Sequence, residues 1–166
     1  MARIHVPIRL RWSDLDAYGH VNNAEMLRLL EEARIQAFWV AEDDFDLGIE
    51  GEAIGGRGPA VLDGRPGAAT LSLIARQEVE YLAPVPYLRR PLDVQLWVGR
   101  LGGASLEICY EVRSPVGVEP NVLFARAATT LVLVDAVTER PRRISDLERA
   151  AWSPYLEQPV AFTKRG

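Results

Sequence analysis

Two carboxylates, a histidine and two asparagines lie close together near the start of this 166-residue chain. In order they are Asp14, Asp16, His20, Asn22 and Asn23, with Gly19 among them. Carboxylates and imidazoles can act as nucleophiles or as general acids and bases. Because a purely structural loop rarely needs so many polar groups, residues 11–23 are predicted to form an active-site loop.

An apolar helix is expected directly after this loop. Asn22 or Asn23 is a suitable N-cap, and the helix should run to about Val40. Glu31 and Arg34 project toward the apolar side one turn apart, so an ion pair that orients the helix is favoured over a catalytic carboxylate. At 100° per residue, one face collects the apolar residues Met26, Leu27, Leu30, Ala33 and Ala37.

Alternating apolar residues predict five strands, at about residues 4–12, 73–81, 92–98, 106–112 and 122–134. Pro7 puts the first strand at a sheet edge, and Gly102-Gly103 predicts a hairpin turn. The other four strands are expected to form a meander, whose last strand is apolar on both faces and so central. Trp97 is expected to be exposed, and Cys109 to lie on a polar face.

This order of elements predicts an α+β fold in a single domain, residues 1–166. The core should span about residues 3–135, followed by a tail with a short helix at 145–157, which begins with the capping box at Ser145 and Glu148. Residues 42–68 are rich in glycine and aspartate, which indicates a functional loop or a mobile segment. An apolar second sheet face and the exposed Trp97 predict a homodimer or homotetramer.

Composition excludes several classes of protein. A net charge of -4 and a pI near 5.3 argue against a protein that binds nucleic acid over a wide face. No run approaches the ~18 apolar residues needed to span a bilayer, so no membrane association is expected. The single cysteine, Cys109, and the lack of a signal-peptide core at the N-terminus favour the cytoplasm.

Residues 11–23 resemble the motif region of the 4-hydroxybenzoyl-CoA thioesterase-like branch of the hotdog-fold superfamily, which includes acyl-CoA thioesterases. The segments Trp12-Ser13-Asp14-Leu15-Asp16 and His20-Val21-Asn22-Asn23 are also similar to plant acyl-carrier-protein thioesterases. A looser similarity continues through residues 30–34 and 81–87. The resemblance implies a hotdog fold, in which an antiparallel sheet of about five strands wraps around one long central helix.

The resemblance also implies unequal roles within the loop. Asp16 matches the essential carboxylate, a nucleophile or general base, and the backbone near Asn23 would stabilise the oxyanion at the helix N-terminus. His20 aligns with a histidine that orients water or the carboxylate, although a structural role is equally compatible. Asp14 is expected to cap the loop through backbone N–H groups. Tyr18 stands where the plant enzymes carry a functional asparagine, so their full catalytic set does not transfer.

The implied reaction is hydrolysis of an acyl-CoA thioester. CoA enters as part of the substrate, with no metal and no other cofactor. Its phosphates are expected near Arg89 or Arg90, and Tyr18 is placed with these substrate-binding residues. The alternatives are an acyl-carrier-protein thioesterase and a non-catalytic acyl-CoA-binding protein. A hotdog hydratase is disfavoured because its aspartate and histidine lie five positions apart, whereas Asp16 and His20 lie four apart.

Overall fold

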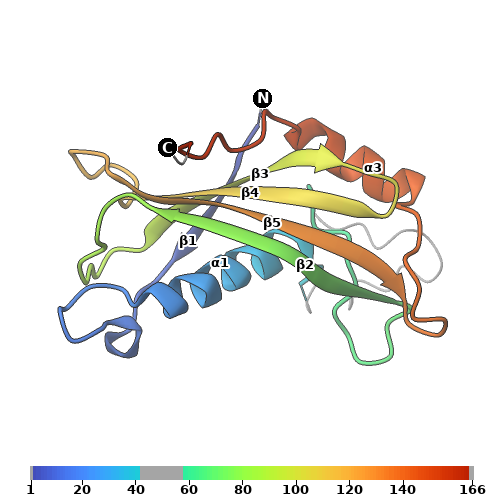
Figure 1. Ribbon diagram of the computed structural model, residues 1–166, viewed down its shortest axis with the longest axis horizontal. Helices are drawn as coiled ribbons and strands as arrows, with labels where there is room; N and C mark the ends of the chain where they lie inside the picture. Colours follow the sequence, from blue (N-terminus) through green and yellow to red (C-terminus); the bar gives the residue numbers. More distant parts are fainter. Residues whose placement is uncertain (1, 42–57, 165–166) are drawn as a thin grey trace.

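Five antiparallel strands form one sheet in this computed structural model, which describes residues 2–41 and 58–164 (Figure 1). The fold is α+β, as predicted. The order in the sheet is β1-β3-β4-β5-β2, so β1 and β2 are the edges. Pro7 therefore lies on an edge strand, as predicted. The strands are β1 (Ile4–Ile8), β2 (Thr70–Tyr81), β3 (Leu92–Leu101), β4 (Ser105–Arg113) and β5 (Leu123–Asp135).

The predicted four-stranded meander is correct only for β3, β4 and β5. Gly102 donates its backbone N–H to the carbonyl of Ser105 at the expected β3–β4 turn. β2 pairs instead with β5, and β3 pairs with β1 on its other side. Residues 82–91 between β2 and β3 include three prolines and are too long for a tight hairpin. They carry the chain from one edge of the sheet to the other.

The helix after the loop is α1 (Asn23–Phe38), and it packs against the sheet along one face (Figure 1). It has 16 residues and ends before Val40, because the chain turns extended at Trp39, where the Val40 N–H bonds to the carbonyl of Leu62. Leu62, within the loop predicted at 42–68, forms an isolated bridge with Trp39. Leu27 was wrongly placed on the apolar face, since it is exposed. The buried residues are Met26, Leu29, Leu30, Ala33, Arg34, Ala37 and Phe38.

The expected ion pair between Glu31 and Arg34 does not form. Glu31 is exposed, whereas Arg34 is buried and its Nη1 donates to the hydroxyl of Tyr110 at 3.0 Å. The two side chains are one turn apart, but only Arg34 points between the helix and the sheet. Burial of a cation thus depends here on a phenol of β4.

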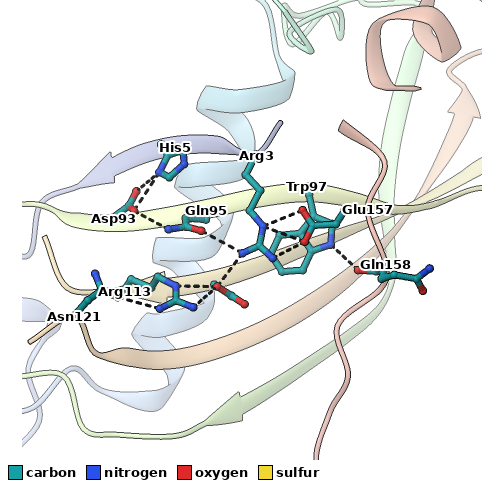
Figure 2. Close-up of polar contacts among 10 residues, drawn as sticks. Arg3, His5, Asp93, Gln95, Trp97, Arg113, Asn121, Glu157 and Gln158 are labelled. Atoms are coloured by element: carbon teal, nitrogen blue, oxygen red, sulfur yellow. Dashed lines mark hydrogen bonds and ion pairs between the residues drawn. The ribbon is translucent and has the colours of Figure 1, made fainter. Parts of the chain in front are cut away.

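The C-terminal segment crosses the face of the sheet opposite α1, which changes two expectations (Figure 2). Trp97 is 3% exposed, because its Nε1 donates to the Gln158 carbonyl and the Arg3 guanidinium lies 3.9 Å from its ring centre. Arg3 in turn pairs with Glu157 and Glu111. Cys109 is also fully buried, not on a polar exposed face. The sequence pattern of the strands alone could not show that residues 156–164 cover them.

The predicted C-terminal helix forms as α3 (Asp146–Trp152), with the expected capping box of Ser145 and Glu148, but it is shorter than the predicted range 145–157. A 3-10 turn, Ser153–Tyr155, follows it. Of the predicted loop at 42–68, residues 42–57 lie outside the described residues. Within the described residues, no helix is long and apolar enough to cross a membrane.

Candidate active site

The loop ahead of α1 is a small hairpin that brings Asp16 and the helix start into one hydrogen-bonded unit. The N–H of Asp16 donates to the carbonyl of His20 at 2.8 Å, and the N–H of Asn22 donates to the carbonyl of Asp14 at 2.8 Å. Leu15 and Val21 form an isolated bridge between these two pairs. One arm therefore carries the acidic residues, and the other leads directly into the helix.

The carboxylate of Asp16 is held by backbone groups. Its Oδ1 accepts the N–H of Tyr18 at 2.9 Å and the N–H of His20 at 3.2 Å. Gly19, with φ of +77°, lets the chain turn back between these two residues. Asp16 is half-buried, and both hydrogen bonds of its carboxylate within the described residues go to Oδ1, so Oδ2 has no partner there. One oxygen is fixed and the second is available to a ligand or a water molecule.

Asp14 caps the loop, as expected. It is fully buried, and its carboxylate accepts the backbone N–H of Arg11 at 2.7 Å and the Arg11 guanidinium at 3.0 Å. Both oxygens are used, so Asp14 holds the start of the loop in place. The two aspartates thus have different environments although they are two residues apart.

Asn22 is the N-cap of α1, and Asn23 is its first residue. The Oδ1 of Asn22 accepts the N–H of Ala24 at 2.8 Å. The first N–H groups of a helix have no partner inside the helix. Among the described residues, the N–H groups of Asn23 and Glu25 have no other acceptor, so they remain available at the positive end of the helix dipole.

Aromatic residues around this loop escaped the sequence analysis. Trp12 was assigned to the first strand, but it begins a 3-10 turn (Trp12–Asp14), is 74% exposed and stacks on Tyr87, with ring centres 4.4 Å apart. The hydroxyl of Tyr81 donates to the carbonyl of Asn23 at 2.6 Å. Only the looser similarity over residues 81–87 pointed to this region, and it gave no contact.

The remaining predicted site residues differ in whether they contact the Asp16 loop. His20 contributes its backbone to Asp16, but its imidazole makes no hydrogen bond within the described part of the chain. The Tyr18 ring is 86% exposed. Arg89 and Arg90 are exposed as well. No described contact links them to the loop, because the Arg90 guanidinium donates to the Val116 carbonyl and the Arg89 carbonyl accepts from Arg9.

The chain belongs to the thioesterase-like superfamily, whose family model matches residues 10–156. It is similar in structure to the PA2801 protein of Pseudomonas aeruginosa, a candidate thioesterase, with 28% identity, a TM-score of 0.64 and coverage of 90% of this chain and 98% of the other. A candidate acyl-CoA thioesterase from Xanthomonas campestris shows 29% identity, a TM-score of 0.58 and coverage of 85% and 98%. Comparison with curated protein sequences gives no match.

These comparisons confirm the predicted family, and the five-stranded antiparallel sheet matches that of its hotdog-type members. They assign no catalytic residue in this chain, so Asp16, His20 and Asn23 stay predictions. A fixed carboxylate with one available oxygen beside unused helix N–H groups can activate or deliver a nucleophile and stabilise an oxyanion.

Proposed function

We propose that the protein is an acyl-CoA thioesterase in which Asp16 is the essential carboxylate. The observation that carries the proposal is the environment of Asp16: two backbone N–H groups hold Oδ1, Oδ2 is available, and the loop is bonded to the start of α1. Family membership supports thioester hydrolysis as the reaction class.

In this proposal the Asp16 carboxylate attacks the thioester carbonyl or removes a proton from a water molecule that attacks it. The carbonyl oxygen becomes an oxyanion that accepts a hydrogen bond from the backbone N–H of Asn23. The carbon–sulfur bond then breaks, and CoA leaves as a thiolate that takes up a proton. Direct attack forms an anhydride with Asp16, which water hydrolyses in a second step. His20 orients the water, and its unpaired imidazole in the described structure fits that role.

CoA is the proposed carrier, with Tyr18 beside the thioester and Arg89 or Arg90 near the phosphates. A guanidinium is well suited to bind phosphate through charge-assisted hydrogen bonds. The exposed position of both arginines, on the connection that also carries Tyr87, supports this assignment. An acyl-carrier-protein substrate and a non-catalytic acyl-CoA-binding role remain the alternatives.

The active form is proposed to be a homodimer or homotetramer that uses the free edge of β2. β2 pairs only with β5 among the described strands, so its other edge presents unpaired backbone groups. Apolar side chains along and beside this strand are exposed: Leu71, Leu73, Ile74, Tyr81 and Leu82. Trp97 no longer supports an interface, since the protein's own C-terminal segment covers it.

The test is thiol release from a panel of acyl-CoAs of increasing chain length, with the matching acyl-carrier-protein thioesters alongside. We expect CoA release from at least one acyl-CoA, with a higher kcat/KM than from the carrier-protein form. Binding of acyl-CoA without release of any thiol would contradict the proposal and favour the binding role. Thiol release from the carrier-protein substrates alone would show that the acyl carrier is the carrier protein and not CoA.

A further inference from the structure

Arg34 is a buried cation without a carboxylate partner among residues 2–41 and 58–164. It is 4% exposed, and its one hydrogen bond joins Nη1 to the hydroxyl of Tyr110. No acidic side chain among the described residues forms an ion pair with it, and Glu31, three residues earlier, is exposed. Within the described part of the chain, a neutral phenol oxygen is thus all that offsets its charge.

Burying a guanidinium with so few hydrogen bonds destabilises the folded protein, which suggests that the group has a further role. Arginine stays charged in proteins and carries five N–H donors, of which Tyr110 uses one. A buried charge without a charged partner is strongly destabilising. No fully buried side-chain nitrogen or oxygen in the described residues lacks a hydrogen-bond partner. The guanidinium donors that Tyr110 does not use must therefore reach open space.

That open space is a cavity of about 810 Å³ between the second half of α1 and the first half of β2. Arg34 lines it together with apolar residues: Ile35, Trp39, Val40, Ile74 and Leu131. Two other charged residues border it. Arg65 pairs with Asp63, and Glu31 lies at the exposed side. The cavity therefore combines an apolar wall with one largely unpaired buried cation.

The cavity and the candidate catalytic loop lie at opposite ends of the boundary between α1 and β2. At one end of β2, the Tyr81 hydroxyl binds the Asn23 carbonyl, and at the other end Ser72 and Ile74 line the cavity with Arg34. Arg34 follows Asn23 by 11 residues in α1, which corresponds to about 16 Å along the helix axis. If an acyl group had its thioester end at the N-terminus of α1 and ran along the boundary between α1 and β2, its far end would reach Arg34.

We propose that Arg34 binds a carboxylate at the distal end of the acyl group, so that the preferred substrates are CoA thioesters of dicarboxylic acids. A guanidinium fork matches a carboxylate with two parallel charge-assisted hydrogen bonds, and the apolar residues of the same cavity would contact the rest of the acyl group. This inference rests on the proposed function for the thioester end of the ligand.

The experiment measures equilibrium binding of non-hydrolysable thioether analogues by titration calorimetry. S-alkyl-CoA and S-(ω-carboxyalkyl)-CoA are compared at matched chain lengths, with wild type, Arg34→Met and Arg34→Lys. At the length that reaches the cavity, wild type should bind the carboxylate analogue about 10- to 100-fold more tightly. Arg34→Met should lose this preference while keeping its affinity for the alkyl analogue, and Arg34→Lys should retain only part of it.

Equal binding of the two analogues by wild type, or a preference that survives in Arg34→Met, would overturn the inference. So would loss of oligomerisation in Arg34→Met without any carboxylate preference in wild type, because the guanidinium would then pair with a second copy of the chain. If Arg34→Met does not fold, the wild-type comparison and Tyr110→Phe, which removes the hydroxyl that orients the guanidinium, decide the question. Binding needs no turnover, so failure of thioester hydrolysis is detected separately by the thiol-release assay.

Discussion

At the scale of single residues, the candidate site depends on a few polar groups, some with all their hydrogen bonds made within the loop and some with donors or acceptors left available. Asp14 uses both oxygens within the loop, whereas Asp16 uses one. The family resemblance allowed this distinction to be predicted, because it matches Asp16 to the essential carboxylate and leaves Asp14 the role of capping the loop. It could not show the Arg34–Tyr110 contact, which joins residues 76 positions apart.

Replacing the N-cap of α1 should destabilise the junction between loop and helix. In Asn22→Ala the Ala24 N–H loses its acceptor, so the free energy of unfolding should fall by about 1 kcal/mol. Urea denaturation measures this change. Asn22→Asp keeps a capping oxygen and serves as the control. Equal stability of the alanine and aspartate variants would contradict the assigned role.

Glu148 should make the stability depend on pH at the acid end. Burial by itself raises the pKa of Glu148, but hydrogen bonds from Arg142 and Ser145 outweigh it and hold that pKa below the ordinary value of 4.5. Because the folded-state pKa is the lower one, the stabilisation is present above pH 4.5 and is lost as the pH falls through the folded value.

The test is thermal unfolding of wild type and Glu148→Gln between neutral and acid pH. At neutral pH the variant should be less stable by about 1–3 kcal/mol, because it loses a charged hydrogen-bond partner. The difference in stability should shrink as the pH falls below 4.5, toward the folded-state pKa of Glu148. A constant difference across all pH values would contradict this account.

At the scale of elements, strand periodicity predicted the five strands well but not what covers them. Alternation along residues 92–98 separates two faces correctly, and the structure confirms that Val94 and Leu96 face the core while Trp97 faces the other way. The segment that buries Trp97 lies some sixty positions later and has no periodic pattern. The same limit applies to β2, whose place beside β5 depends on a long connection and not on local sequence.

Removing the C-terminal segment should expose the single cysteine. Burial raises the pKa of the Cys109 thiol to about 12, and residues 157–160 lie over this part of the sheet. A chain that ends at Leu156 should therefore react with a thiol-specific reagent at least tenfold faster than the full chain, since the thiolate is the reactive form. The rate at which the reagent releases its coloured product measures the reactivity of the thiol, and circular dichroism checks the fold. Equal slow rates in two folded proteins would contradict the covering role.

At the scale of the whole molecule, the two faces and two edges of the sheet have different surroundings. α1 covers one face and the C-terminal segment crosses the other (Figure 1). The short β1 edge carries Pro7, whereas the 12-residue β2 edge is long and partly apolar. An oligomer was predicted from an apolar second sheet face and an exposed Trp97, but Trp97 is buried under the C-terminal segment. The β2 edge is the better argument.

A charge on this edge should weaken self-association. Leu73 is 55% exposed, and Leu73→Lys should shift the protein toward monomer by at least tenfold in the dissociation constant, because lysine on an edge strand opposes pairing. Val137→Lys, at an apolar residue 90% exposed in the turn after β5, is the matched control. Size-exclusion chromatography with light scattering measures both. A monomeric wild type, or an unchanged Leu73→Lys oligomer, would contradict the interface.

The most direct test of the account compares kcat/KM for the best acyl-CoA in Asp16→Asn and Asp135→Asn. Asp135 is a matched control, because its Oδ1 also accepts two nearby backbone N–H groups, from Val137 and Thr138, in the turn after β5. Asp16→Asn should lower kcat/KM by about 10²- to 10⁴-fold with the fold retained, whereas Asp135→Asn should leave it nearly unchanged. Full activity in Asp16→Asn, or equal losses in both variants, would contradict the assignment of Asp16 as the catalytic carboxylate.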